Sequence, residues 1–166
     1  MILSVAIIAL LTIQRISELF LASHNTRRLM AQGAVETGAD HYIYIVLLHA
    51  AWLVGLAILA WDRPISLVML VIILVLQVGR AWVVLTLGPR WTTRIITLPG
   101  APLVRKGPYR FLSHPNYVVV VLEIALTPLA FGLLWFALVF SILNAIMLRV
   151  RIRTEARALR VAQGAA

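Results

Sequence analysis

The stretch that decides the fold is residues 65–87, which read ISLVMLVIILVLQVGRAWVVLTL. Only Gln77 and Arg80 near its end are strongly polar, and a helix of about 20 apolar residues crosses the ~30 Å hydrocarbon core of a bilayer. Apolar runs of similar length extend from Ile2 to about Ala22 and from about Tyr42 to Trp61. The sequence therefore predicts helices that span a membrane.

The composition of the whole chain favours the same conclusion. Of its 166 residues, 62% are hydrophobic and 13% are charged, and the mean hydropathy is +0.97. A soluble domain of this size cannot bury so much apolar surface, so the expected solvent is lipid. The length fits one domain, residues 1–166. The first run has no basic N-terminal region and carries Arg15 and Glu18, so we expect a retained helix rather than a cleaved signal peptide.

Two shorter apolar runs follow a polar stretch that extends from Gly88 to Pro108. They span about Tyr117 to Ala130 and Leu133 to about Leu148, and Gly132 separates them. Because both runs are short for full spans, two arrangements stay open: a tight helical hairpin, or helices that extend inward at the His114-Pro115 end, where proline suits the first turn of a helix. The fold class predicted is an all-α integral membrane protein with about five transmembrane helices.

The basic residues predict the orientation. The loop after the first helix, the loop after the third helix and the tail hold nearly all of them: Arg27, Arg28, Arg90, Arg94, Arg105, Lys106, Arg110, Arg149, Arg151, Arg153, Arg157 and Arg160. Only Arg63 lies on the other side. By the positive-inside rule the N-terminus is outside and the C-terminus is cytoplasmic. The net charge of +9 then indicates contact with anionic lipid, and we expect no nucleic-acid partner.

Several polar side chains lie within the apolar runs: Arg15, Glu18, Gln77, Arg80, Glu123 and Asn144. Arg15 and Glu18 share a helix face and can pair. Ionisable groups inside a bilayer are costly and often mark a functional cavity. Arg15 and Arg80 can instead extend to the headgroups, and both interpretations stay open. Glu123 has no obvious local partner.

Metal and thiol chemistry are not expected. The chain has no cysteine, which excludes disulfides, thiolate ligands and cysteine nucleophiles. His41 and His49 are two turns apart at the start of the second helix, but no carboxylate or thiol completes a ligand set. Interfacial hydrogen bonding or substrate contact is the expected role of these histidines.

The segment that carries the chemistry is residues 98–117, LPGAPLVRKGPYRFLSHPNY, which holds four of the seven prolines. Glycine and proline at this density force turns and leave backbone groups outside helical hydrogen bonding. Such backbone at a membrane face is buried in protein or lines a site. An ordinary basic loop and the wall of a site both explain this composition.

Three motifs resemble the isoprenylcysteine carboxyl methyltransferases, membrane enzymes that use S-adenosylmethionine. They are Gly107-Pro-Tyr109, His114-Pro-Asn-Tyr117 at the head of the hairpin, and Arg151-Ile-Arg-Thr-Glu155 just beyond it. The resemblance spans roughly Leu87 to Leu159, and the order and spacing of the motifs make it specific.

The first half resembles a bacterial branch of that family, whose members are associated with type III polyketide synthases and O-methylate long-chain alkylpyrones. The residues concerned are Gln14-Arg15, Glu18-Leu19, Asn25, Gly33-Ala34, Glu36, Gly38 and His41-Tyr42. This branch implies a bacterial inner (plasma) membrane and a lipophilic small-molecule substrate that arrives from the membrane lipid.

The resemblance also assigns roles. A cytoplasmic pocket for S-adenosylmethionine forms from the loop after the third helix, the last hairpin and the C-terminal tail. Its cofactor-binding residues are a strand-like stretch of Ala101, Pro102, Leu103 and Val104, together with Tyr109, His114, Pro115, Asn116, Tyr117 and Glu155. Arg151 faces the substrate oxygen, and His114 is the nearest base if that oxygen belongs to a neutral phenol. An acidic enol or a carboxylate needs no base.

The chain departs from the family pattern at Ser113, where the family usually has arginine, and at Ala156, where it usually has a second glutamate. Ser113 weakens an anion contact at that point, whereas Glu155 keeps the more important carboxylate. The usual cytoplasmic extension after Leu159 is also missing. Alternatives to an alkylpyrone O-methyltransferase are a protein C-terminal isoprenylcysteine carboxyl methyltransferase, an NADPH-dependent membrane reductase, a phospholipid amine methyltransferase and a non-enzymatic subunit or small transporter.

Overall fold

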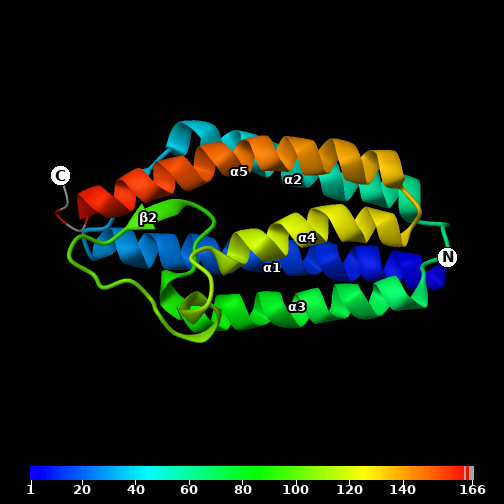
Figure 1. Cartoon of the computed structure of the whole chain (residues 1–166), viewed down its shortest axis with the longest axis horizontal. Helices are drawn as coiled ribbons and strands as arrows, with labels where there is room; N and C mark the ends of the chain where they lie inside the picture. Colours follow the sequence, from blue (N-terminus) through cyan, green and yellow to red (C-terminus); the bar gives the residue numbers. More distant parts are fainter. Residues whose placement is uncertain (163, 165–166) are drawn as a thin grey trace.

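A bundle of helices with nearly aligned axes forms the body of the protein. The computed structural model describes residues 1–162 and 164, and in this part of the chain it contains five α-helices: α1 (Ile2–Ala31), α2 (Ala39–Ala60), α3 (Leu67–Leu87), α4 (Pro115–Ala130) and α5 (Leu134–Ala162). All lie along one long axis (Figure 1). The four long helices are long and apolar enough to cross a membrane, and α4 is a shorter apolar helix. The predicted multi-pass membrane architecture is confirmed.

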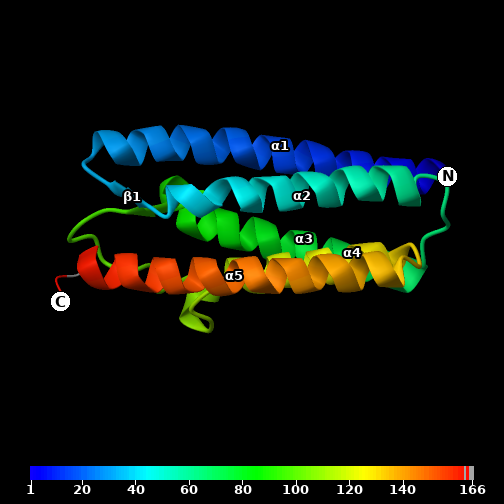
Figure 2. The same ribbon diagram turned by 90° about the horizontal axis from the view of Figure 1, so that it is seen from above.

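The two strands and the long loop before α4 gather at one end of the bundle, which we call the loop end (Figures 1 and 2). Here β1 (Val35–Thr37) pairs antiparallel with β2 (Ile95–Thr97), so the strict all-α prediction misses one small sheet. Two short 3-10 turns, η1 (Gly88–Arg90) and η2 (Gly107–Arg110), frame the long loop. The strand of this loop is β2, whereas the stretch 101–104, predicted to be strand-like, is irregular.

Two helices continue past their predicted ends. The first continues beyond Ala22 to Ala31, and the last continues through the arginine-rich tail to Ala162. Arginine and alanine have high helix propensity, so the helical backbone continues beyond the last residue of the apolar run. At about 1.5 Å per residue, α5 exceeds the ~30 Å core of a bilayer. Its last turns therefore stand in the loop end, where they can line a site.

The hairpin between α4 and α5 turns at Gly132. Its φ of +73° lies in the left-handed region that a side chain would strain, which explains why glycine closes this turn. Inside the bundle, Trp52 and Leu56 of α2 pack with Ile124 of α4 in the hydrophobic core. Most other large apolar side chains of the spanning helices are exposed, as expected for residues that face lipid.

A buried cluster of charges joins α1, α3 and α4. Arg15 Nη2 lies 2.5 Å from the Glu123 carboxylate and its Nη1 lies 3.3 Å from Glu18. Arg80 donates two hydrogen bonds to Glu18, and its Nη1 lies 2.9 Å from Glu123. Gln77 donates to the other Glu123 oxygen at 2.9 Å. The arginines therefore do not extend to the headgroups, and the partners that Glu123 lacked nearby in the sequence come from other helices.

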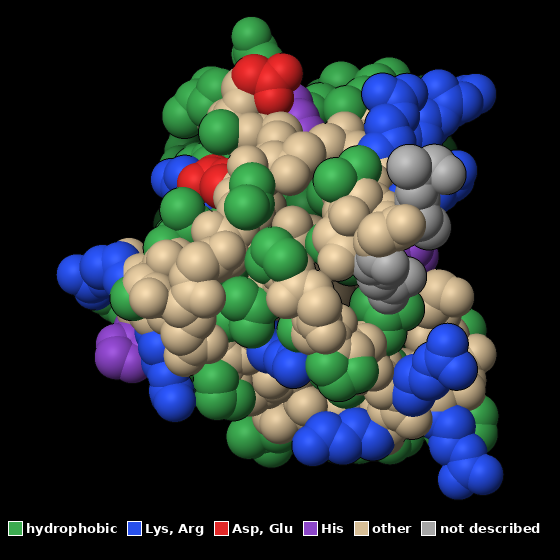
Figure 3. All heavy atoms as spheres, turned by 90° about the vertical axis from the view of Figure 1, so that its left-hand side faces the viewer, with side chains coloured by type: hydrophobic (Ala, Val, Ile, Leu, Met, Phe, Trp, Pro, Cys, Tyr) green, Lys and Arg blue, Asp and Glu red, His purple; other side chains and the backbone are tan. Residues whose placement is uncertain are grey.

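The exposed basic side chains are concentrated at the loop end, and Figure 3 shows them spread around the rim of that face. They are Arg27, Arg28, Arg90, Arg105, Lys106, Arg110, Arg149, Arg153, Arg157 and Arg160. At the opposite end Arg63 is exposed. The folded chain thus keeps the charge asymmetry from which we predict that the loop end faces the cytoplasm.

We expect Glu123→Gln to destabilise the fold by about 3–5 kcal/mol, because it leaves a buried arginine charge uncompensated. Thermal unfolding in detergent measures the effect. Glu36→Gln is the control, since it removes the partly exposed pair with Arg94, whose value is about 0–1 kcal/mol. Similar losses in the two variants would contradict a special role for the buried cluster.

The orientation is tested by reporters at the two ends of the chain. A cytoplasmic reporter fused after Ala166, a residue outside the described part, should be active, and a periplasmic reporter there should be silent. The same pair of reporters fused before Met1 should give the opposite result. Periplasmic activity at the C-terminus would reverse the assignment of the loop end.

Candidate active site

A cavity of about 470 Å³ opens within the loop end, and we call it the loop cavity. The long loop, the start of α4 and the end of α5 supply most of its lining. Almost all of the predicted site residues line it: Ala101, Pro102, Leu103, Val104, Tyr109, His114, Asn116, Tyr117, Arg151 and Glu155. The exception is Pro115, which is buried as the first residue of α4. The structure thus brings together residues that are far apart in the sequence.

Specific contacts hold the loop over this cavity. Arg90 Nη1 donates to the carbonyl oxygen of Pro102 at 2.6 Å, and the amide of Gly100 donates to the carbonyl of Ala162 at 3.2 Å. Gly107 has a φ of +55°, and a Cβ on it would lie 2.5 Å from Thr86 Oγ1. A residue with a side chain does not fit there, so Gly107 lets the loop rest directly on the end of α3.

A chain of hydrogen bonds crosses the site. Arg151 Nη2 donates to the carbonyl of Thr93 at 2.6 Å, and its Nε donates to Tyr117 Oη at 2.9 Å. The Tyr117 hydroxyl in turn donates to the carboxylate of Glu155. The His114 ring stacks on that of Tyr117 at 5.3 Å, and its Nδ1 lies 3.9 Å from Glu155. Tyr117 therefore fixes the positions of Arg151 and Glu155 relative to each other.

Arg151 differs from the other arginines of the tail. It is buried, with 9% of its surface exposed, whereas Arg149, Arg153, Arg157 and Arg160 are all exposed. Its Nη1 makes no hydrogen bond within residues 1–162 and 164, so one donor group remains for a ligand. The burial and the free donor separate Arg151 from arginines that only face headgroups.

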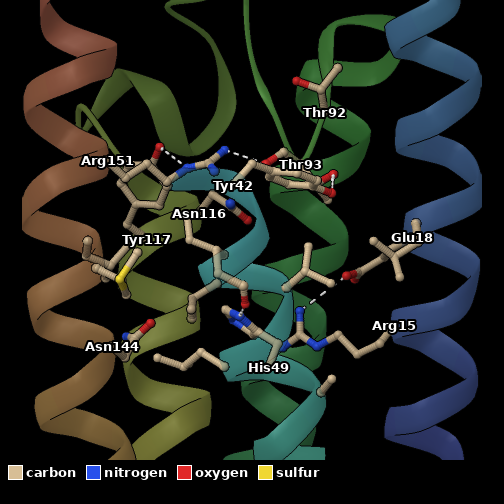
Figure 4. A pocket seen from close by; sticks show the side chains of 18 of the residues that line it. Arg15, Glu18, Tyr42, His49, Thr92, Thr93, Asn116, Tyr117, Asn144 and Arg151 are labelled. Atoms are coloured by element: carbon tan, nitrogen blue, oxygen red, sulfur yellow. Dashed lines mark hydrogen bonds and ion pairs between the residues drawn. The ribbon is translucent and has the colours of Figure 1, made fainter. Parts of the chain in front are cut away.

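A second cavity of about 220 Å³ lies within the helices, and we call it the bundle cavity (Figure 4). Apolar side chains such as Leu19, Ile45 and Leu148 form much of its wall. Five residues line both cavities: Trp91, Thr92, Asn116, Tyr117 and Arg151. We call this set the junction. The loop cavity, whose lining mixes polar and apolar groups, thus meets the more apolar bundle cavity beside the free donor of Arg151.

Comparison with known proteins identifies the family. Residues 67–161 match the isoprenylcysteine carboxyl methyltransferase (ICMT) family. The chain belongs to this family. Its members are S-adenosylmethionine-dependent membrane methyltransferases, and the resemblance found in the three sequence motifs is confirmed.

Other similarities extend the match to the N-terminal half. The chain is 42% identical over 158 residues to the uncharacterized protein YpbQ of Bacillus subtilis (strain 168), an alignment that covers 92% of this chain and 94% of that protein. No solved structure matches the chain. The region matched by the ICMT family includes nearly the whole lining of the loop cavity.

The junction contains polar atoms that lack partners. Trp91 Nε1 and Asn116 Oδ1 are buried and make no hydrogen bond in the described part of the chain. Buried polar atoms are rarely left unpaired, so a donor and an acceptor are available here to a bound molecule. Burial and the Glu155 carboxylate raise the pKa of Tyr109, so its hydroxyl stays protonated as a further donor.

The histidines lie in different places. His114 lines the loop cavity and is absent from the lining of the bundle cavity, so the structure does not place it beside an acceptor bound between the helices. His49 lines the bundle cavity, where its Nδ1 donates to the carbonyl of Ile45 at 2.8 Å. His41 lies 3.4 Å from Asp40 and lines neither cavity.

Sequence reasoning missed the segment 91–94. Besides Trp91, it contains Thr93, which accepts from Arg151 and shares a 2.9 Å hydrogen bond with Tyr42. Arg94 lies 2.8 Å from Glu36 and 4.6 Å above the Tyr42 ring, and the bond to Glu36 raises the pKa of Arg94. The available signal was that a polar run directly precedes an Ile-Ile strand. No local pattern shows that this run faces α5.

Proposed function

We propose that the chain is an S-adenosylmethionine-dependent O-methyltransferase that acts on a lipophilic acceptor with an acidic oxygen, such as a long-chain alkylpyrone. The observation that carries this proposal is the junction, where the loop cavity, of mixed polarity, meets the more apolar bundle cavity at Arg151. A water-soluble methyl donor and a lipid-soluble acceptor need such a pair of binding spaces. We assign the loop cavity to the donor and the bundle cavity to the acceptor.

The loop cavity suits the cofactor in size and chemistry. Its volume of about 470 Å³ lies in the range of roughly 300–1,000 Å³ typical of ligand pockets. Glu155 offers a carboxylate to an ammonium group or ribose hydroxyls, and the unpaired atoms of Trp91 and Asn116 offer a donor and an acceptor. Residues 101–104 and Tyr109 complete the wall, with His114 stacked on Tyr117. When bound, the cofactor supplies a methyl group on a sulfonium centre.

The protein's contribution to the reaction is alignment and the exclusion of water. Methyl transfer is an in-line displacement, so the acceptor oxygen must be held on the axis of the bond that breaks. Arg151 orients that oxygen with its free Nη1, while Thr93 and Tyr117 fix the guanidinium. An oxygen that arrives as an anion needs no general base. His114, on the loop side, then belongs to the cofactor pocket rather than to proton transfer.

The lining of the bundle cavity supports an alkylpyrone as the acceptor. Arg15, Glu18, Leu19 and Tyr42 all line it, and these residues belong to the motifs that resemble the alkylpyrone branch. The hydroxyl of a 4-hydroxy-2-pyrone ionises readily and its alkyl tail suits apolar walls. An isoprenylcysteine carboxylate also combines an anion with an apolar tail, and the family match makes it the second candidate.

Orientation completes the proposal. The loop end faces the cytoplasm of a bacterium, with the inner membrane around the helices, so that the donor reaches the loop cavity from the cytosol. The acceptor reaches the bundle cavity from the membrane. The donor therefore approaches the junction from water, and the acceptor approaches it from lipid.

Glu155→Gln should weaken binding of S-adenosylmethionine by roughly tenfold to over a hundredfold, because a hydrogen bond to a charged group contributes about 1.5–3 kcal/mol. Binding of the radiolabelled cofactor to purified protein measures this, and thermal unfolding checks that the variant folds. Asp40→Asn, which removes an exposed carboxylate at the same end of the bundle, should change nothing. Failure of the unaltered protein to bind the cofactor would refute the methyltransferase assignment, and unchanged affinity in the variant would remove Glu155 from the pocket.

Arg151→Lys keeps the charge but loses the planar donor geometry, so turnover should fall at least tenfold while cofactor binding stays near normal. Arg151→Ala should be slower still. Arg149→Lys and Arg157→Lys are the matched controls, since both arginines are exposed on the same helix. Methyl transfer is assayed with a long-chain 4-hydroxy-2-pyrone and with a prenylcysteine analogue. Equal losses of turnover in the three lysine variants would mean that Arg151 only anchors the helix to lipid headgroups. Activity on the prenylcysteine analogue alone would exclude the alkylpyrone as acceptor.

A further inference from the structure

The bundle cavity contains a polar side chain that the proposed transfer does not use. Asn144 of α5 is only 3% exposed, and its amide makes no hydrogen bond within the part of the chain that the structure describes. Figure 4 shows the side chain pointing from α5 into the cavity. Polar side chains inside a membrane bundle often line a functional cavity, and the Asn144 amide faces the cavity here, so a ligand group is a natural partner for it.

His49 stands on another wall of the same cavity, on α2 (Figure 4). Its Nδ1 lies 2.8 Å from the carbonyl oxygen of Ile45, an atom that only accepts, so Nδ1 carries the proton. In the neutral ring Nε2 is then an acceptor. Asn144 can both donate and accept, so the pair suits a group that does the same.

The two side chains lie at the same depth. Asn144 is seven residues from Arg151 on α5, and His49 is seven residues from Tyr42 on α2. Arg151 and Tyr42 both hydrogen-bond to Thr93, at 2.6 Å and 2.9 Å, so these two residues lie at a similar position along the bundle axis. Seven helical residues rise about 10 Å. Because α2 leaves the loop end and α5 returns to it, both side chains lie about 10 Å below the junction.

The other charged groups in this wall are already paired. Arg15, Glu18 and Arg80 line the cavity, but their ionic groups bind one another and Glu123. They therefore shape the cavity without offering strong unpaired donors or acceptors. Asn144 and His49 keep that capacity.

We propose that Asn144 and His49 form a hydroxyl-binding subsite, and that the preferred acceptor carries a hydroxyl group on its tail about 10 Å from the oxygen that is methylated. The hydroxyl donates to His49 Nε2 and accepts from the Asn144 amide. This inference rests on the proposed function, because it takes the bundle cavity as the acceptor site. It adds a second polar feature to an acceptor otherwise defined by an acidic head and an apolar tail.

Two probes test the subsite. Both are 4-hydroxy-2-pyrones with alkyl tails of equal length, and one bears a tail hydroxyl about 10 Å from the enol oxygen. Thermal stabilisation of the detergent-purified protein measures binding, and transfer of radiolabelled methyl groups is measured separately. The unaltered protein should bind the hydroxylated probe about tenfold more tightly.

Variants assign that preference to the two residues. Asn144→Leu and His49→Phe should each lose the preference and bind the two probes with similar affinity, whereas Ser141→Ala, one turn from Asn144 and outside both cavity linings, should retain it. Equal binding of the two probes by the unaltered protein, or a preference that survives in both variants, would overturn the subsite. A preference in binding without any methyl transfer would refute the proposed function alone, and no binding of either probe would overturn both.

Discussion

The structure depends on a cluster of two arginines and two glutamates inside the helix bundle, where an unpaired charge would be strongly destabilising. Lipid offers helices little hydrophobic reason to associate, so packing and interhelical hydrogen bonds must hold the bundle together. Arg15 and Glu18 come from α1, Arg80 from α3 and Glu123 from α4, and the two positive and two negative side chains balance. Removing any one of these helices leaves buried ions without partners. The cluster therefore fixes α1 against α3 and α4 more strictly than apolar contacts can.

The same cluster explains where the bundle cavity lies. Its arginines and Glu18 form one wall, and α2 and α5 supply the facing walls. Because the long α5 continues past the membrane core, it carries Arg151 to the top of this cavity and Glu155 one turn further into the loop cavity. Tyr117, at the start of α4, bonds to both residues. One helix, α5, and one side chain, Tyr117, thus set the spacing between the two cavities.

Hydropathy predicted the helices because a membrane span needs about 20 consecutive apolar residues, a pattern that is visible within one stretch of sequence. It failed at Ala31 and Ala162, where helix propensity continues after the apolar run has ended. The loop cavity was predicted from motifs, because its residues occupy a few fixed positions around Tyr117. Pairing of β1 with β2 and the partners of Glu123 were not predictable, since both join segments far apart in the chain. That Trp91 lines both cavities was not predictable from the sequence either.

Three arginines, Arg15, Arg80 and Arg151, line the bundle cavity, and among these three only Arg151 is suited to hold an anion. Arg15 and Arg80 already donate to Glu18 and Glu123, and the cluster has no net charge to attract an ionised oxygen. Arg151 donates to a carbonyl and to a phenol oxygen, both of them neutral, and its pairing with Glu155 runs only through Tyr117. Its positive charge is therefore less compensated than those of the cluster. Under the proposed function, an amphipathic acceptor should enter with its acidic oxygen toward Arg151 and its tail toward the middle of the membrane, which is the orientation that methyl transfer from a donor in the loop cavity would require.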